Sequence, residues 1–224
     1  MSEVHVHAPP ELGESASRAA ERREHRWELV ATVLLAVATV GIAWSGYEAA
    51  RWNGLQSQDF ARANTARSEA NRASTAAGQD RLQDLLNFNR WLEVTTQGNT
   101  ALADLYQRRF RPEFVPAFQA WLAQDPLHNA AAVASPLSMP QYHLALLGTS
   151  DHLERVGDQR FDDGRLATEH TDAYVLTTVF FAAVLFFAGI SLRFGWERLR
   201  VTVLVLGVVF LGYGVARLAT LPIH

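Results

Sequence analysis

The sequence predicts an all-α membrane protein in which three transmembrane helices carry an extramembrane helical bundle, inserted between the first and the second. Three observations lead to this fold class. Residues 29–47, 173–192 and 201–216 contain no charged side chain, although the 224 residues include 20 basic and 23 acidic ones. The eight prolines leave residues 11–111 and 141–221 without this helix breaker. Good helix formers, chiefly alanine, arginine, glutamine and glutamate, are frequent between the first two apolar windows.

The segregation of charge excludes several protein classes that the average composition would allow. With 49% hydrophobic and 19% charged residues, the chain looks soluble on average, but its charges all lie outside the three apolar windows. This pattern excludes a single soluble domain and a disordered chain, and the absence of cysteine excludes a disulfide-stapled module. Residues 49–171 carry 12 arginines and 14 acidic residues, so nucleic-acid binding is not supported.

The first predicted span covers residues 27–48 and follows a polar segment, residues 1–26, that we expect to be a disordered cytoplasmic N-terminus. Trp27 and Trp44 mark its two ends, because aromatic rings prefer the headgroup level of a bilayer. A cleaved signal peptide is the alternative, since small residues near Ala43 could suit a signal peptidase. The polar segment before the span is long for a signal peptide, which favours a retained signal anchor instead.

The second and third predicted spans are residues 172–192 and 201–221, joined by a short cytoplasmic loop, residues 193–200. About 20 apolar residues at ~1.5 Å each cross a hydrocarbon core of ~30 Å. The third span needs Arg217 to extend its side chain to the headgroups. Residues 222–224 form a C-terminal tail.

Arginine placement predicts the orientation, because short cytoplasmic flanks are enriched in positive charge. Arginines before span one and in the loop after span two fall on the same side of the membrane: Arg18, Arg22, Arg23, Arg26, Arg193, Arg198 and Arg200. This places the N-terminus in the cytoplasm and residues 49–171 outside it. The lipid bilayer is therefore the first expected partner.

Residues 49–171 are predicted to form a helical bundle with two long arms that continue the flanking spans. The outgoing arm has a coiled-coil seam of small residues at alternating spacings of three and four: Ala63, Ala66, Ala70, Ala73 and Ala77. Chance in an Ala-rich segment is the alternative. A heavier apolar stripe follows and suits a bundle core: Leu82, Leu85, Leu86, Phe88, Trp91 and Leu92.

The two arms differ in length, so the outgoing arm must fold back. Residues 49–111 would extend ~90 Å as one helix, whereas residues 141–171 would return only ~45 Å. Gly98 can end one helix and Thr100 can cap the next. Residues 114–124 read as a further short amphipathic helix.

Antiparallel arms would also place opposite charges side by side. The expected pairs are Arg51 with Glu169, Arg62 with Asp158, Arg67 with Glu154, and Asp59 with Arg160. Such exposed pairs stabilise by only ~0.2 to 1 kcal/mol each, so they select the register more than they hold the fold. Two separately solvated faces are the alternative.

Sites for chemistry are sparse. The sequence has no phosphate-binding loop, nucleophile elbow, paired zinc motif or dinucleotide fingerprint, so we expect no enzyme, no cofactor and no metal. His5 and His7 are too few ligands for a good metal site. The acidic residues of the returning arm could bind a divalent cation, although a solvated face is favoured.

Two sets of residues remain as candidate sites. Trp91, Phe118 and Trp121 could form either a ligand pocket or a core cluster. Small residues in the spans provide surfaces for close helix packing, within one chain or in an oligomer: Gly41, Ser45, Gly207, Gly212 and Gly214.

Three stretches resemble a family of bacterial three-span inner-membrane proteins with no assigned activity: residues 44–54, 110–114 and 185–191. The resemblance implies a bacterial inner-membrane location and transfers no functional residue. The chain is also loosely similar to chemoreceptor sensor modules. It departs from them on the cytoplasmic side, because only the short loop of residues 193–200 follows span two.

We therefore expect a non-enzymatic membrane protein whose extracytoplasmic bundle is an interaction or scaffolding domain, within a homo-oligomer or with another membrane protein. A ligand-sensing accessory subunit without an output domain is the second hypothesis. A small oligomeric channel is the third, since three spans alone cannot enclose a pathway.

Overall fold

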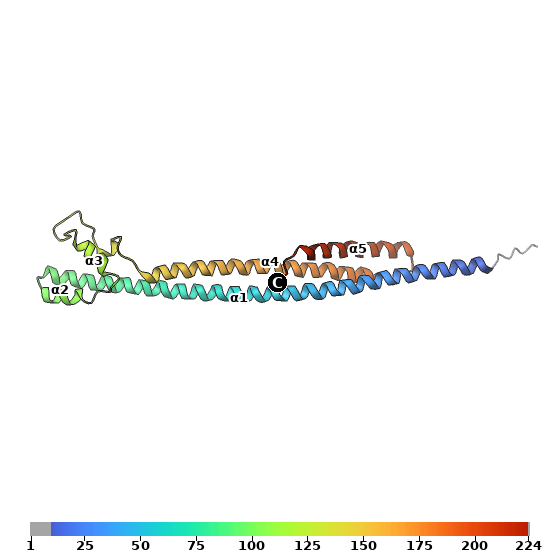
Figure 1. Ribbon diagram of the computed structural model, residues 1–224, viewed down its shortest axis with the longest axis horizontal. Coiled ribbons are helices and arrows are strands. Elements are labelled where there is room, and N and C mark those ends of the chain that lie inside the picture. Colours follow the sequence, from blue (N-terminus) through green and yellow to red (C-terminus); the bar gives the residue numbers. More distant parts are fainter. Residues whose placement is uncertain (1–9, 224) are drawn as a thin grey trace, which may run out of the picture. The chain divides into compact units, whose positions relative to one another are not determined.

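The structure is a computed structural model that describes the backbone of residues 10–223 and side chains from Arg22 onward (Figure 1). Every regular element in this range is helical, in agreement with the predicted class. In chain order they are α1 (Pro10–Thr96), α2 (Thr100–Gln107), α3 (Val115–Leu122), the short 3-10 helix η1 (Pro136–Ser138), α4 (Ala145–Ser191) and α5 (Glu197–Thr220).

The chain divides into two compact units, which we describe separately. The span unit contains the residues up to Gln58 and those from Gly164 onward, and the bundle unit is Asp59–Asp163. Helices α1 and α4 contribute to both units, whereas α2, α3 and η1 lie in the bundle unit and α5 in the span unit.

Helix α1 passes without a break from the first apolar window into the outgoing arm, as expected from its composition. It also begins earlier than expected, at Pro10, so residues 10–26 are helical where we expected disorder. Proline favours the start of a helix, and the following residues are rich in glutamate, alanine and arginine. The remaining expectation, for residues 1–9 with His5 and His7, lies outside the described residues.

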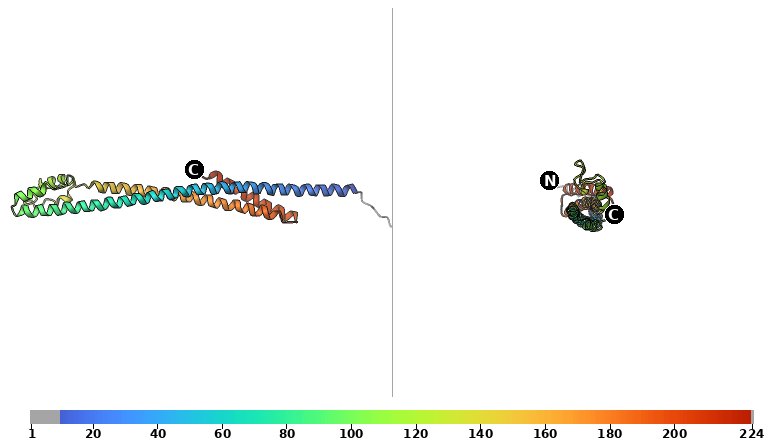
Figure 2. Two further views of the ribbon diagram at one scale, coloured as in Figure 1. Left: turned by 90° about the horizontal axis from the view of Figure 1, so that it is seen from below. Right: turned by 90° about the vertical axis from the view of Figure 1, so that its left-hand side faces the viewer.

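Three helices of the described chain, α1, α4 and α5, are long and apolar enough to cross a membrane. In the span unit they bury a core of Ala31, Leu34, Ala38, Phe181, Val184, Ala188 and Leu204. Both views show α5 alongside the C-terminal part of α4 (Figures 1 and 2), where Phe180 contacts Tyr213 and Phe187 contacts Phe210. Large apolar side chains also cover the outer surface, including Val40, Val179, Phe186 and Val209. An apolar exterior of this kind suits lipid contact.

Small residues allow the spans to approach closely. A methyl group added at Gly41 would lie 2.7 Å from the Phe181 ring, and one added at Gly214 would lie 3.1 Å from it. Gly207 packs near Phe187, at 3.7 Å by the same measure, whereas Gly212 has no such neighbour within 4 Å. Three of the four predicted packing glycines therefore lie between helices of this chain, and Gly212 is exposed.

The loop between α4 and α5 is shorter than the predicted residues 193–200, because α5 begins at Glu197. Trp196 is the extended N-cap residue of α5. The Arg200 side chain folds back to donate to the Phe194 carbonyl oxygen, at 3.1 Å from one terminal nitrogen, and this contact satisfies a loop carbonyl.

Within the bundle unit, α1 and α4 pack through the predicted alanine seam. Ala63, Ala66, Ala70 and Ala77 are buried, while Ala73 is half-buried. The Ser150 hydroxyl donates to the Ala70 carbonyl oxygen at 3.0 Å. A carbonyl of one helix is reached by a short side chain of the other only where the two backbones are close, which small seam residues permit.

The charged pairs of the arms follow the predicted register in part. Asp59 and Arg160 form the expected ion pair at 3.6 Å. Asp158 pairs with Arg67 at 2.9 Å instead of with Arg62, which bonds Asp59 at 3.4 Å within its own helix. Arg51 lies against the Tyr47 ring and donates to its hydroxyl at 3.3 Å.

Candidate functional site

The far end of the bundle unit is built by the predicted reversal after α1. Gly98 has a φ of +77°, a left-handed conformation that glycine adopts without strain. Asn99, not the expected Thr100, caps α2, and its side-chain oxygen accepts from the Leu102 backbone at 3.1 Å. Asparagine is among the best N-cap residues, so the expected cap position was wrong by one residue.

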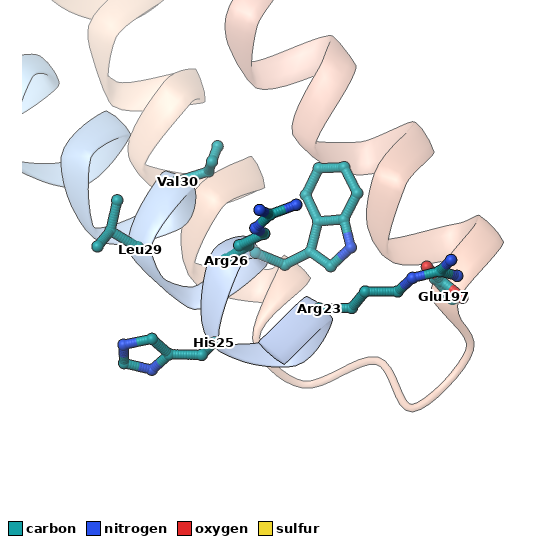
Figure 3. Close-up of a pocket in the computed structure, with 7 residues that line it drawn as sticks. Arg23, His25, Arg26, Leu29, Val30 and Glu197 are labelled. Atoms are coloured by element: carbon teal, nitrogen blue, oxygen red, sulfur yellow. The ribbon is translucent and has the colours of Figure 1, made fainter. Parts of the chain in front are cut away.

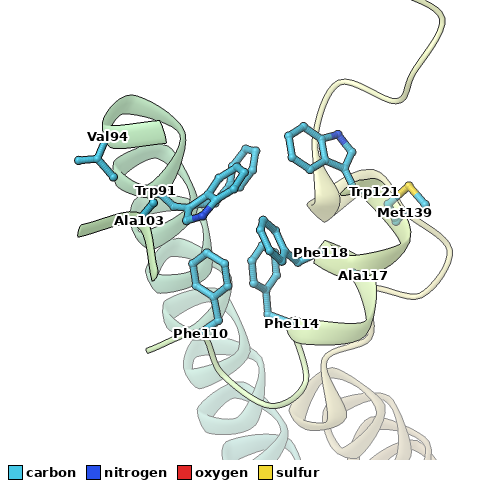
Figure 4. Packing of buried hydrophobic residues seen from close by; sticks show 10 residues of the cluster. Trp91, Val94, Ala103, Phe110, Phe114, Ala117, Phe118, Trp121 and Met139 are labelled. Atoms are coloured by element: carbon cyan, nitrogen blue, oxygen red, sulfur yellow. The ribbon is translucent and has the colours of Figure 1, made fainter. Parts of the chain in front are cut away.

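Trp91, Phe118 and Trp121 come together in the core that this reversal creates (Figure 4). Trp91 and Phe118 meet edge to face with ring centroids 4.8 Å apart, and all three side chains are buried. The Trp121 indole nitrogen donates to the Val133 carbonyl oxygen at 2.6 Å. Phe110, Phe114 and Phe88 surround them, so the sequence-predicted aromatic set lies inside a packed hydrophobic core.

A polar cluster that the sequence did not reveal closes this core. Asp84 on α1 is 1% exposed, accepts from the Arg111 guanidinium at 3.2 Å and accepts from the Tyr142 hydroxyl at 3.0 Å. Arg111 also pairs with Asp80 and, at 3.0 Å, with Glu113. One arginine thus joins the loop after α2 to α1, and Tyr142 joins the segment before α4 to the same carboxylate.

Burial raises the pKa of two members of this cluster, Asp84 and Tyr142. Desolvation raises the pKa of Asp84 above its ordinary value, although the Tyr142 hydrogen bond and the Arg111 charge act in the opposite direction. Burial, together with the neighbouring Asp84 charge, raises the pKa of Tyr142. The cluster is a satisfied structural network, and its groups have partners within the bundle unit.

The exposed surface of α1 in the bundle unit carries three neighbouring leucines, which we call the leucine strip. Leu82 is 55% exposed, Leu85 38% and Leu86 57%. The sequence placed all three in the core stripe, but only Phe88 and Trp91 are buried, and Leu92 packs partly against them. Residues 84, 88 and 91 face inward, so on a helix of 3.6 residues per turn the strip faces away from the core.

A second unpredicted feature lies in the span unit, at the end of the first apolar window. Glu48 is 1% exposed, while its neighbour Tyr47 is exposed. Glu48 interacts electrostatically with the buried Tyr174, and the Tyr174 hydroxyl donates to the Pro222 carbonyl oxygen at 3.1 Å. The Trp52 indole nitrogen donates to the same carbonyl at 3.3 Å.

The spacing of small residues could have located Glu48. Gly41, Ser45 and Glu48 follow each other at intervals of four and three, so they share one face of α1, and all three are buried. The Ser45 hydroxyl oxygen forms no hydrogen bond within the described residues.

Neither a metal site nor a known relative points to a function. Among the described residues, no group of three or more histidine, aspartate or glutamate side chains could hold a metal ion. No protein-family model, no curated protein and no solved structure matches the chain.

Proposed function

We propose that the protein is a non-enzymatic, multi-pass membrane protein whose bundle unit is an interaction module that docks through the leucine strip of α1. Three adjacent leucines, the large apolar side chains that α1 exposes within the bundle unit, carry this proposal. A contiguous apolar patch on a soluble domain typically marks a protein contact, whereas single exposed leucines are ordinary.

A second copy of this chain is the partner that we infer. Two-fold symmetry would bring the same strip from two copies together, and leucine against leucine is self-complementary. Gly78 lies one turn before Leu82, and a methyl group added there would meet no heavy atom of another described segment within 4 Å, so a second helix could approach closely.

The proposed setting is a bacterial inner membrane with the bundle unit outside the cytoplasm. Arginine placement supports this orientation, because Arg23 and Arg26 precede the first span while Arg193 and Arg198 lie between the second and third.

The test is the mass of the intact particle after mild-detergent extraction, with every co-purifying chain identified. We expect a dimer for the parent and a monomer for the double variant Leu82→Gln/Leu86→Gln. The control is Leu105→Gln/Leu127→Gln, which removes two leucines of the same unit, 37% and 50% exposed, and should leave the dimer intact.

Other outcomes are equally informative. A parent that is a lone monomer contradicts an interaction module. A different membrane protein that is lost with the Leu82/Leu86 variant and kept with the control replaces the second copy as partner. A dimer that survives in both variants moves the contact away from the leucine strip.

A further inference from the structure

The span unit contains a groove where the part of α1 around the start of the apolar window meets the start of α5 (Figure 3). Its volume is about 620 Å³. The lining combines cationic and apolar side chains with one acid: Arg23, His25, Arg26, Trp27, Leu29, Val30 and Glu197.

The lining changes from charged to apolar along the axis of α1. Arg23 and Arg26 stand on the turn before the window, and Leu29 and Val30, both exposed, begin it. Trp27 lies between the two zones, and tryptophan favours the level of lipid headgroups. A polar mouth that continues into an apolar wall matches an amphiphile, not a small hydrophilic ion.

The charges at the mouth favour an anion. Within residues 22–223, neither Arg23 nor Arg26 has a carboxylate oxygen within 4 Å, although Glu197 also lines the groove and Arg23 points toward it in Figure 3. Arg200 on α5 is already engaged, with Glu24 at 3.6 Å and with the Phe194 carbonyl. The two guanidinium groups of α1 therefore keep donors for a ligand.

We propose that this groove binds an anionic phospholipid, with its phosphate against Arg23 and Arg26 and an acyl chain along Leu29 and Val30. Guanidinium groups bind phosphate oxygens through directed pairs of hydrogen bonds, which are stronger than neutral ones. Basic pockets beside transmembrane helices are suited to anionic headgroups, and each arginine near such a surface adds about 1 kcal/mol. The site is independent of the leucine strip and of the proposed interaction module.

The experiment measures which lipid the full chain retains. The purified protein is exposed to equal amounts of phosphatidylglycerol and phosphatidylcholine with matched acyl chains, and bound lipid is counted by native mass spectrometry. We expect the parent to retain phosphatidylglycerol at least about tenfold better than phosphatidylcholine, since two arginine contacts at ~1 kcal/mol each give this ratio or more.

Three variants locate the preference. Arg23→Gln/Arg26→Gln should abolish it, and Arg23→Lys/Arg26→Lys should keep most of it because the charge remains. Arg198→Gln removes an exposed arginine of the first turn of α5 that does not line the groove, so it should retain the full preference. If the glutamine double variant unfolds, the lysine variant and the parent at raised salt still test the charge dependence.

Equal retention of the two lipids by the parent would overturn the proposal. So would a loss of preference in Arg198→Gln as large as in the glutamine double variant, because a diffuse surface charge would then explain it. Inorganic phosphate alone, titrated by calorimetry, should not bind measurably; binding as tight as that of the lipid would show that the acyl chain contributes nothing.

Discussion

The bundle unit should open far more readily in the variant Asp84→Ala than in the parent protein. The change leaves the Tyr142 hydroxyl without its acceptor and leaves Arg111 with Asp80 and Glu113 only. Breaking a buried ion pair typically costs ~3 to 5 kcal/mol, and the remaining partners of Arg111 put the cost at the lower end, about 3 kcal/mol. At ~1.4 kcal/mol per tenfold change, the opening equilibrium should rise about 10²-fold.

The absence of cysteine makes this measurable in the full chain. Val94 is buried in the same core, so a Val94→Cys background gives one thiol that reacts only when the unit opens. Thiol labelling should be about 10²-fold faster with Asp84→Ala. The labelling rate of Asp84→Asn should lie between those of the parent and Asp84→Ala, because its amide oxygen can still accept a hydrogen bond from Tyr142.

The control for this experiment is Asp104→Ala, the same change at an exposed carboxylate of the same unit, which should label at the parent rate. The reasoning is refuted if Asp84→Ala labels within about threefold of the parent, since ~0.6 kcal/mol would then be the whole contribution of the cluster.

Three further predictions use the same chain. Gly41→Ala should lower the thermal stability of the detergent-solubilised protein by ~1 to 3 kcal/mol, because its methyl group would lie 2.7 Å from the Phe181 ring, whereas Gly212→Ala should be near neutral; equal effects would contradict the packing. Burial raises the pKa of Asp84 in the folded state above its ordinary value of 3.8, which applies to the unfolded state. Between the unfolded-state and folded-state pKa values the folded protein binds more protons, so the stability of the bundle unit should fall as pH rises through that window. Labelling of Val94→Cys against pH checks this, and Asp84→Asn should remove the slope. Asp158→Asn should change the free energy of opening by less than ~1 kcal/mol, since its pair with Arg67 is largely solvent-exposed. A change above this limit that persists at raised salt would show that the pair does more than select the register.

The helical class and the course of the chain could be read from the sequence because they depend on local signals. Proline-free segments predicted the long helices, and Gly98 marked the reversal. The prediction of disorder for residues 10–26 was wrong because it rested on polarity alone, although the residue types favour a helix.

The inward face of α1 could not be read from the sequence alone. Six apolar residues between Leu82 and Leu92 cover more of the helix circumference than one core contact can bury. The segment from Phe110 to Trp121 folds against Phe88 and Trp91 and leaves the leucines outside. Tertiary contacts therefore decide which face of α1 is buried, and the periodicity of the sequence carries no information on those contacts.

Asp84 and Glu48 were missed for a related reason. Asp84 meets Arg111 and Tyr142 across long stretches of chain, so no spacing rule links them. Glu48 was the last residue of the predicted first span, and only its place on the same face as Gly41 and Ser45 indicated burial.

The two hydrogen bonds at Pro222 have a consequence for sequence variation. Trp52 and Tyr174 both donate to its main-chain oxygen, an atom that any amino acid at this position would supply. Natural variants can therefore drift at position 222 without losing the acceptor, whereas phenylalanine at 52 or 174 deletes a donor. A comparison of related chains would record constraint at the two aromatic positions and little at the third, so covariation would fail to reveal a contact that joins α1 and α4 to the segment after α5.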